Sequence, residues 1–233
     1  MNLIGHKYAT FRDGPLLVKA QDLSVRGRLP VACYREALAY RLGTRLGLAI
    51  PPTELLTHPK HGRLSVQRWL EDARPPSQER LDCLRFEPTG IRILLLDLLV
   101  ANADRRDENL IERDGTILPI DFNVAFAFAG ATPRIEMPEM TIMRWFGTAG
   151  VLALPTDGMS HLEAQVASFE HLISDPYIRF AVAQLPDEFV TAPERERLQQ
   201  GLASRRAAMA TWLRDWWQRT VEPLHRFREV QDD

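Results

Sequence analysis

The sequence predicts an α+β protein with two lobes, a small β-containing N-terminal lobe with one helix and a larger, mainly helical C-terminal lobe. Within the first 70 residues, short runs of strand-forming residues alternate with turn signals. The segment 90–100 is apolar almost all the way round, which indicates a helix buried on most sides. After residue 161, apolar residues recur at helical spacing. We therefore expect an N-terminal lobe over residues 1–70 and a helical lobe over residues 71–233.

Composition argues against nucleic acid and anionic membrane as partners. The 233 residues include 29 Lys and Arg against 31 Asp and Glu, a formal net charge of -2. Such a balance creates no overall field that would gather nucleic acid or anionic membrane, so we expect neither as a direct partner. At roughly 150 residues per domain, the length fits one large domain or two closely packed lobes.

The cysteines and the apolar segments indicate the cellular compartment of the protein. Cys33 and Cys83 are too few for a disulfide framework and lack the spacing of a zinc site. We expect both to be buried small hydrophobic residues in a reducing compartment. Residues 1–7 lack the apolar run of a signal peptide, and the longest apolar stretch is too short to span ~30 Å of hydrocarbon. We therefore expect a cytoplasmic protein without a membrane partner.

The N-terminal lobe is expected to begin with a hairpin whose second strand carries a lysine, Lys19, among apolar residues. A polar linker leads to Pro30, a good first residue for a helix that ends at Gly47 and carries Glu36. The strands expected in this lobe are residues 7–11, 16–20, 53–56 and 64–69.

In the C-terminal lobe, the buried helix over residues 90–100 runs into a charged loop, residues 102–109. A hairpin follows, with Asp114-Gly115 as its turn. Beyond Asp121 the chain is expected to be irregular as far as Pro155. The remaining helices are expected over residues 161–173, 177–183 and 192–219.

Three oxygen-bearing side chains are expected to converge near the charged loop. The buried helix delivers Asp104 into this loop, Asn109 closes the loop, and the hairpin folds Asp121 back beside it. Phosphoryl transfer from a nucleotide uses such a set. One carboxylate orients or deprotonates the acceptor hydroxyl, and a second carboxylate with an amide oxygen holds magnesium on the phosphates.

A cation on the other side of the phosphates is also needed, and Lys19 is the natural candidate. A lysine buried in an apolar strand is costly unless a partner neutralises it. Glu36, on the following helix, could do so and could also orient the ammonium group. The order of strand lysine, helix glutamate, loop Asp and Asn, and Asp after a hairpin matches the template of protein kinases.

With these residues in place, the chain resembles the HipA-like kinases of bacteria and, more distantly, the phosphatidylinositol kinases of the same protein-kinase-like superfamily. The resemblance covers most of residues 16–125. The segments that carry it are Leu17-Val18-Lys19, Arg35-Glu36-Ala37-Leu38-Ala39, Leu46-Gly47-Leu48-Ala49-Ile50-Pro51-Pro52, Asn102-Ala103-Asp104-Arg105-Arg106-Asp107-Glu108-Asn109-Leu110 and Pro119-Ile120-Asp121-Phe122-Asn123.

The resemblance implies a two-lobed, ATP- and magnesium-dependent phosphotransferase that acts on a hydroxyl, with Ser or Thr of a protein substrate as the expected acceptor. It implies that Asp104 is the catalytic carboxylate and that Asn109 and Asp121 are the magnesium ligands. Lys19, paired with Glu36, is implied to bind the ATP phosphates. It further implies that the hinge, which meets adenine through its backbone, includes Gln67, Arg68 and Trp69.

The sequence also departs from the family pattern. Arg106 replaces a frequent His after the catalytic Asp and cannot accept a proton. Asn123 stands where Gly is usual, and no G-x-G-x-x-G loop precedes Lys19. Two alternatives therefore stay open, a pseudokinase or nucleotide-binding regulatory module, and a small-molecule or lipid kinase. The sequence indicates neither the particular acceptor nor the oligomeric state.

Overall fold

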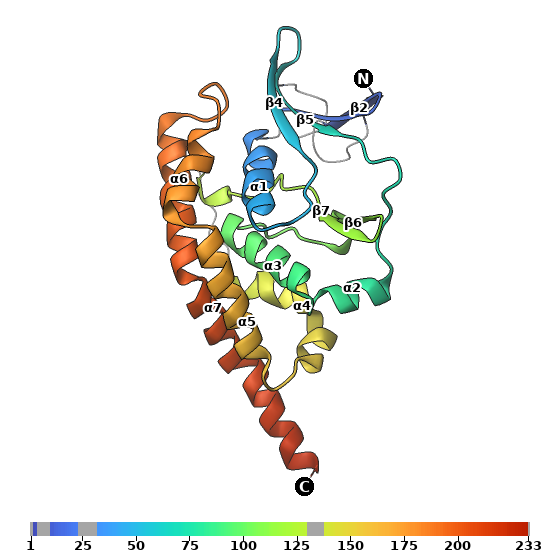
Figure 1. Cartoon of the computed structure of the whole chain (residues 1–233), viewed down its shortest axis with the longest axis vertical. Helices are drawn as coiled ribbons and strands as arrows, with labels where there is room; N and C mark the ends of the chain where they lie inside the picture. Colours follow the sequence, from blue (N-terminus) through green and yellow to red (C-terminus); the bar gives the residue numbers. More distant parts are fainter. Residues whose placement is uncertain (1, 4–9, 23–31, 130–137, 233) are drawn as a thin grey trace.

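The computed structural model describes residues 2–3, 10–22, 32–129 and 138–232 of the chain. It is an α+β structure with a small antiparallel sheet at one end and a larger group of helices below it, as the sequence predicts. Figure 1 shows the longest helix, α7 (Ala192–Asp232), running along the side of the molecule to the C-terminus, which lies at the end opposite the sheet.

The sheet places Lys19 on its central strand. Its order is β1-β2-β3-β5-β4, and all neighbouring strands are antiparallel. Lys19 on β3 pairs with Thr10 on one side and Ser65 on the other. Because paired and alternate residues share a face of a sheet, Arg12, Leu17 and Lys19 lie on the same face. The strands are β1 (Asn2–Leu3), β2 (Thr10–Asp13), β3 (Leu16–Ala20), β4 (Thr53–His58) and β5 (Gly62–Arg68).

The first hairpin turn is shorter than the four residues, 12–15, that separate the two expected strands. Asp13 pairs with Leu16, so only Gly14 and Pro15 form the turn, and Gly14 has a φ of 57°. Glycine adopts this left-handed conformation without steric cost. Residues 7–9 of the expected first strand lie outside the described residues, as does Pro30, the expected start of the first helix. In the described part of the chain, that helix is α1 (Tyr34–Arg45).

Helix α1 packs between the sheet and α3 (Pro88–Val100), as Figure 1 shows. Residues 93–100 of α3 are all buried, which confirms the helix predicted from the apolar run. Leu38 and Leu42 of α1 belong to the same hydrophobic core as the leucines of α3. Since this core crosses residue 70, the boundary between lobes stays a prediction.

Two helices were not expected from the sequence. Helix α4 (Pro138–Ala153) lies within the segment that we expected to be irregular, so that prediction is wrong. Gly147, with a φ of 63°, kinks the helix. The second is α2 (Gln78–Leu84), a short helix whose N-cap, Ser77, accepts a hydrogen bond from the Arg80 N–H.

The remaining elements agree with the sequence in type but differ in length. Helix α7 continues well past the predicted end at residue 219, through Pro223, because Val221 is still buried on the core face. Among the described residues, no helix is both long and apolar enough to cross a membrane. The other elements of this lobe are β6 (Leu110–Arg113), β7 (Thr116–Pro119), α5 (Gly158–Leu172) and α6 (Asp175–Ala183).

Candidate active site

The side chain of Lys19 lies at the contact between the sheet and the segment after β7. Only 6 % of this residue is exposed. Its Nζ donates hydrogen bonds to a carboxylate oxygen of Glu36 on α1, to Oδ1 of Asp121 at 3.1 Å and to Oδ1 of Asn123 at 3.3 Å. A buried ammonium with two carboxylates and an amide oxygen is fully compensated.

Glu36 joins this lysine to the backbone after β7. Its Oε1 accepts from Lys19 and, at 2.9 Å, from the Phe122 N–H. The residue is 1 % exposed, so the carboxylate depends entirely on these protein donors. Glu36 therefore fixes the position of the Phe122 backbone relative to α1 as well as that of the ammonium group.

The electrostatics of the cluster keep Lys19 charged. Burial alone would lower the pKa of Lys19, because desolvation penalises the ammonium form. The carboxylates of Glu36 and Asp121 outweigh this effect, and the pKa lies above its ordinary value. The Lys19 side chain therefore keeps its positive charge at neutral pH.

Asp121 lies at the surface end of the cluster. It has a φ of 59°, in the left-handed region that Asp tolerates better than most residues, and its side chain is 39 % exposed. Its Oδ1 accepts from Lys19 and from the side-chain amide of Asn123. With more than a third of its side chain exposed, Asp121 is the member of the cluster that a further cation could reach.

Asn123 belongs to this cluster, although we did not predict it as a site residue. It is 7 % exposed and contacts both Lys19 and Asp121 through its side chain. Its carbonyl accepts from Arg35 Nη1 at 2.7 Å. The replacement of the usual Gly by a residue with a polar side chain was the signal that could have identified it.

The charged loop after α3 presents Asp104 at the surface. The Asp104 side chain is 36 % exposed, and its Oδ1 accepts from Arg106, with Nε and Nη2 each at 3.1 Å. Asn109 closes the loop, since its Nδ2 donates to the Asp104 carbonyl at 2.8 Å. This bond leaves the side-chain oxygen of Asn109 available for another partner.

The donor set fits magnesium held jointly by protein and nucleotide. Among the residues that the structure describes, no cluster of three or more His, Cys, Asp or Glu side chains could hold a metal ion. Asn109 and Asp121 instead offer one amide and one carboxylate oxygen, and the Ile120 N–H donates to the Asn109 carbonyl at 3.0 Å, so the two residues lie on adjoining backbone. Magnesium sites on nucleotides typically use one or two carboxylates plus phosphates and water.

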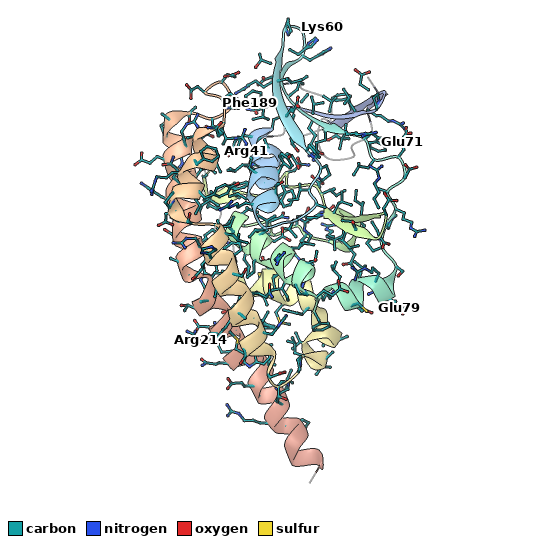
Figure 2. All side chains as sticks on the ribbon, viewed as in Figure 1. Arg41, Lys60, Glu71, Glu79, Phe189 and Arg214 are labelled. Atoms are coloured by element: carbon teal, nitrogen blue, oxygen red, sulfur yellow. The ribbon has the colours of Figure 1, made fainter. Side chains whose placement is uncertain are left out.

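A cavity of about 600 Å³ lies at the turn end of β3, near the expected hinge. Arg12, whose guanidinium lies 5.0 Å from the centre of the Trp69 ring, also forms an ion pair with Glu71 there. Figure 2 labels Glu71, on the segment that leads from the sheet toward α2. The lining residues are Arg12, Gly14, Pro15, Arg68, Trp69, Glu71, Asp72 and Arg113.

Two of the three expected hinge residues line this cavity. Arg68 and Trp69 line it, but the side chain of Gln67 is buried and donates to Thr53 Oγ1 at 2.7 Å. The Trp69 N–H donates to the Pro15 carbonyl at 2.6 Å, so this backbone donor is already used. From Pro15 to Lys19, the strand spans about 13 Å at ~3.3 Å per residue.

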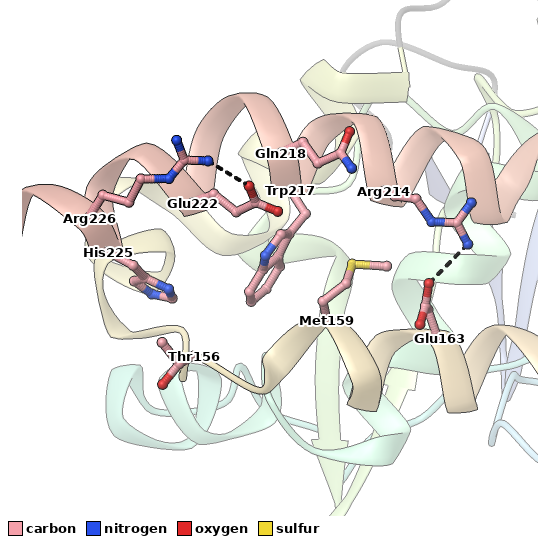
Figure 3. Close-up of a pocket in the computed structure, with 9 residues that line it drawn as sticks. All are labelled: Thr156, Met159, Glu163, Arg214, Trp217, Gln218, Glu222, His225 and Arg226. Carbon is pink, nitrogen blue, oxygen red and sulfur yellow. Dashed lines mark hydrogen bonds and ion pairs between the residues drawn. The ribbon is translucent and has the colours of Figure 1, made fainter.

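A second pocket of about 480 Å³ lies elsewhere, between α5 and the C-terminal half of α7 (Figure 3). Its walls carry two ion pairs, Arg214 with Glu163 and Arg226 with Glu222. None of the predicted site residues lines it.

Sequence reasoning also missed Arg105, which we had named only as one residue of the charged loop. It is 5 % exposed and forms an ion pair with Asp97, itself 1 % exposed. The signal was Asp97, an acidic residue inside an apolar helix, because a buried carboxylate requires a charged or hydrogen-bonding partner nearby.

Comparison with solved structures identifies the fold of the chain. No protein-family profile matches the chain, and no curated protein matches its sequence. Among solved structures, the proinflammatory kinase CtkA of Helicobacter pylori matches with a TM-score of 0.60 at 13% identity, over 92% of this chain and 94% of that one. HipA of the Shewanella oneidensis MR-1 toxin–antitoxin system matches with a TM-score of 0.55 at 14% identity, over 91% and 68%. The chain therefore has the protein-kinase-like fold that these two structures share.

Proposed function

We propose that the protein is an ATP- and magnesium-dependent phosphotransferase of the HipA-like type, which transfers the γ-phosphoryl group to a hydroxyl, with protein Ser or Thr as the acceptor. The observation that carries this proposal is the contact of Lys19 with both Glu36 and Asp121. A strand lysine, a helix glutamate and an aspartate after a hairpin meet in the order that the kinase template requires.

Each side chain then has a chemical role. Lys19 stays protonated, and Glu36 holds its ammonium in place. Because all three N–H donors are used in the structure, phosphate oxygens would replace Asp121 or Asn123 as acceptors on Nζ. Asn109 and Asp121 would hold magnesium, which supplies positive charge on the phosphates when bound. Asp104 orients the acceptor hydroxyl and takes its proton as the oxygen bonds to the γ-phosphorus and the bond to ADP breaks.

Two further observations support the proposal. The face of the sheet that carries Lys19 also carries Arg12, which lines the cavity near the hinge. The cavity, lined by Pro15 just before β3, therefore lies about 13 Å along the chain from Lys19. One of the similar structures is a kinase, CtkA.

The test is transfer of label from γ-labelled ATP in the presence of magnesium to a cell extract, followed by identification of the labelled species. Wild type should label a protein on Ser or Thr, and Asp104→Ala and Asp121→Ala should each abolish labelling while retaining the fold by circular dichroism. Label in a small molecule or lipid would instead support that acceptor class. No transfer by wild type, or transfer unchanged in Asp104→Ala, would refute the proposal.

A nucleotide-binding regulatory module without turnover is the second candidate, and one contact favours it. Arg106 lies on Oδ1 of Asp104, where an acceptor hydroxyl would have to approach. For this function, nucleotide should raise the melting temperature of the protein without any phosphoryl transfer, because a ligand that binds the native state stabilises that state. The cytoplasmic location stays a prediction.

A further inference from the structure

The end of α3 carries a buried carboxylate with a complete set of partners. Asp97 is 1 % exposed, and Asn102 Nδ2 donates to its Oδ1 at 2.8 Å. Arg105 donates to both carboxylate oxygens, from Nε at 2.8 Å and from Nη2 at 3.0 Å. This bidentate pair fixes the orientation of the Arg105 guanidinium in its plane.

The other edge of the same guanidinium reaches two separate segments. Nη1 of Arg105 donates to the carbonyl of Asn109 at 2.8 Å and to the carbonyl of Ile120 at 2.7 Å. The guanidinium carbon also lies 4.8 Å from the centre of the Phe122 ring. One buried side chain therefore links the end of α3, the loop that carries Asn109 and the backbone that leads into Asp121.

We propose that Arg105 is a positioning residue that sets the spacing between Asn109 and Asp121 and thereby determines how tightly the site holds a magnesium–nucleotide complex. This inference rests on the proposed function. Arg105 itself touches neither metal nor nucleotide in this scheme. It acts through the two carbonyls that it holds, one on the Asn109 residue and one on the residue before Asp121.

The guanidinium is suited to this task in a way that an ammonium is not. Binding two oxygens of Asp97 and two carbonyls at once requires the planar, forked donors of arginine. Lysine keeps the charge and can satisfy Asp97, but a single ammonium nitrogen cannot span the same four oxygens. Loss of a residue that orients metal ligands typically costs about 10–100-fold in metal affinity or activity.

The experiment compares Arg105→Lys with Arg195→Lys. Arg195 is the control, because it also binds two carbonyls, of Val182 and Leu185, and an aspartate, Asp187, although this aspartate is exposed. Thermal stabilisation by ADP is measured first in EDTA and then with increasing Mg²⁺. Direct binding of Mn²⁺ in the presence of ADP is measured by electron paramagnetic resonance.

We expect Arg105→Lys to bind ADP in EDTA as wild type does but to need about 10–100-fold more Mg²⁺ for the half-maximal magnesium-dependent shift. Its affinity for Mn²⁺ should fall by a similar factor. In turnover assays, the Mg²⁺ concentration that gives the half-maximal rate should rise by a similar factor. Arg195→Lys should lower the melting temperature without changing the metal dependence.

The outcomes separate this inference from the proposed function. If wild type shows no magnesium-dependent shift, the metal site is wrong and the inference falls with it. If wild type responds and Arg105→Lys responds equally, only the inference is overturned. Should Arg105→Lys not fold, Asp97→Asn provides the second variant, since it keeps the shape of the carboxylate but removes the charge that holds Arg105. If Arg105→Lys and Asp97→Asn both fail to fold while Arg195→Lys folds, Arg105 has only a structural role and the proposal is overturned.

Discussion

The Nζ of Lys19 lies 3.1 Å from Oδ1 of Asp121, although the two residues are separated by 102 positions in the sequence. This contact joins the central strand of the sheet to the segment that follows β7 in the helical lobe. Glu36 reinforces the contact, because it accepts from Lys19 and from the Phe122 N–H. The two lobes are therefore coupled through charged groups at the place where we propose that nucleotide binds.

Replacing Lys19 alone should destabilise the fold strongly. Lys19→Met leaves the buried Glu36 carboxylate without its counter-charge, and breaking one partner of a buried pair costs about 3–5 kcal/mol. The double variant Lys19→Met/Glu36→Gln should recover most of this loss, because the Gln amide oxygen can still accept from the Phe122 N–H. Urea unfolding of the three proteins measures the difference.

The control for this series is Lys60→Met, a change of the same kind at the exposed β4–β5 turn labelled in Figure 2. It should leave the free energy of unfolding within about 0.5 kcal/mol of wild type. Equal effects of Lys19→Met and Lys60→Met would contradict the buried charge cluster.

Removing Arg106 should change catalysis more than stability. Its ion pair with Asp104 is exposed, 65 % and 36 % for the two side chains, so Arg106→Ala should cost less than about 1 kcal/mol. Because the change frees Oδ1 of Asp104, we expect a faster transfer to a protein acceptor in the labelled-ATP assay. The double variant Asp104→Ala/Arg106→Ala should be inactive, and a slower Arg106→Ala would show that the guanidinium serves the reaction instead.

Much of the site follows from the order of elements along the chain. A polar residue in a buried setting requires a partner, and this rule, together with the order of the kinase template, led from Lys19 to Glu36. The structure brings both together with Asp121. The roles assigned to these residues stay predictions until transfer is measured.

The same rule was not applied to Asp97, and the Asp97–Arg105 pair was therefore missed. Asp97 interrupts an apolar helix, and Arg105 follows it by eight positions, on a loop dense in charges. A charged loop is usually solvated, so nothing in its composition separates the one buried arginine from the exposed Arg106 beside it. Only the requirement that the buried Asp97 carboxylate have a charged partner could have identified Arg105.

Helices were missed for a different reason. The buried residues of α4, such as Ile142, Trp145 and Phe146, do recur at helical spacing. Prolines and glycines surround them, however, and Gly147 changes the direction of the helix within the run. Conversely, Pro223 did not end α7, because packing of Val221 against the core outweighs one lost backbone hydrogen bond.

Thiol titration should distinguish the two cysteines. We expected both to be buried, but Cys83 is exposed, whereas Cys33 has no exposed surface and donates from Sγ to the Lys19 carbonyl at 3.1 Å. At about pH 8, a thiol reagent should modify one cysteine per folded chain and both after unfolding in guanidinium. The variant Cys83→Ser should show no fast reaction, and modification of Cys33 in the folded chain at the rate of a free thiol would contradict its burial.

Stability should fall at alkaline pH, partly through Cys33. Burial raises the pKa of this thiol from its ordinary value of 9.0 to about 11. Above pH 9, the unfolded chain loses the proton while the folded chain keeps it, so the contribution is complete below pH 9 and is lost as pH rises toward 11. Lys19 does not contribute to this early decline, because its raised pKa keeps its stabilisation in full below about 10.5.

Cys33→Ala isolates the thiol, since Ala is small, apolar and does not titrate. Between pH 9 and pH 10, the free energy of unfolding of wild type should decrease by on the order of 1 kcal/mol more than that of the variant. Urea unfolding at closely spaced pH values measures both curves. Below pH 8 the two curves should run parallel, since the thiol is neutral in both states there. Curves that stay parallel up to pH 10 would mean that the Cys33 thiol ionises as readily in the folded chain as in the unfolded one, which its burial beside the Lys19 carbonyl should prevent.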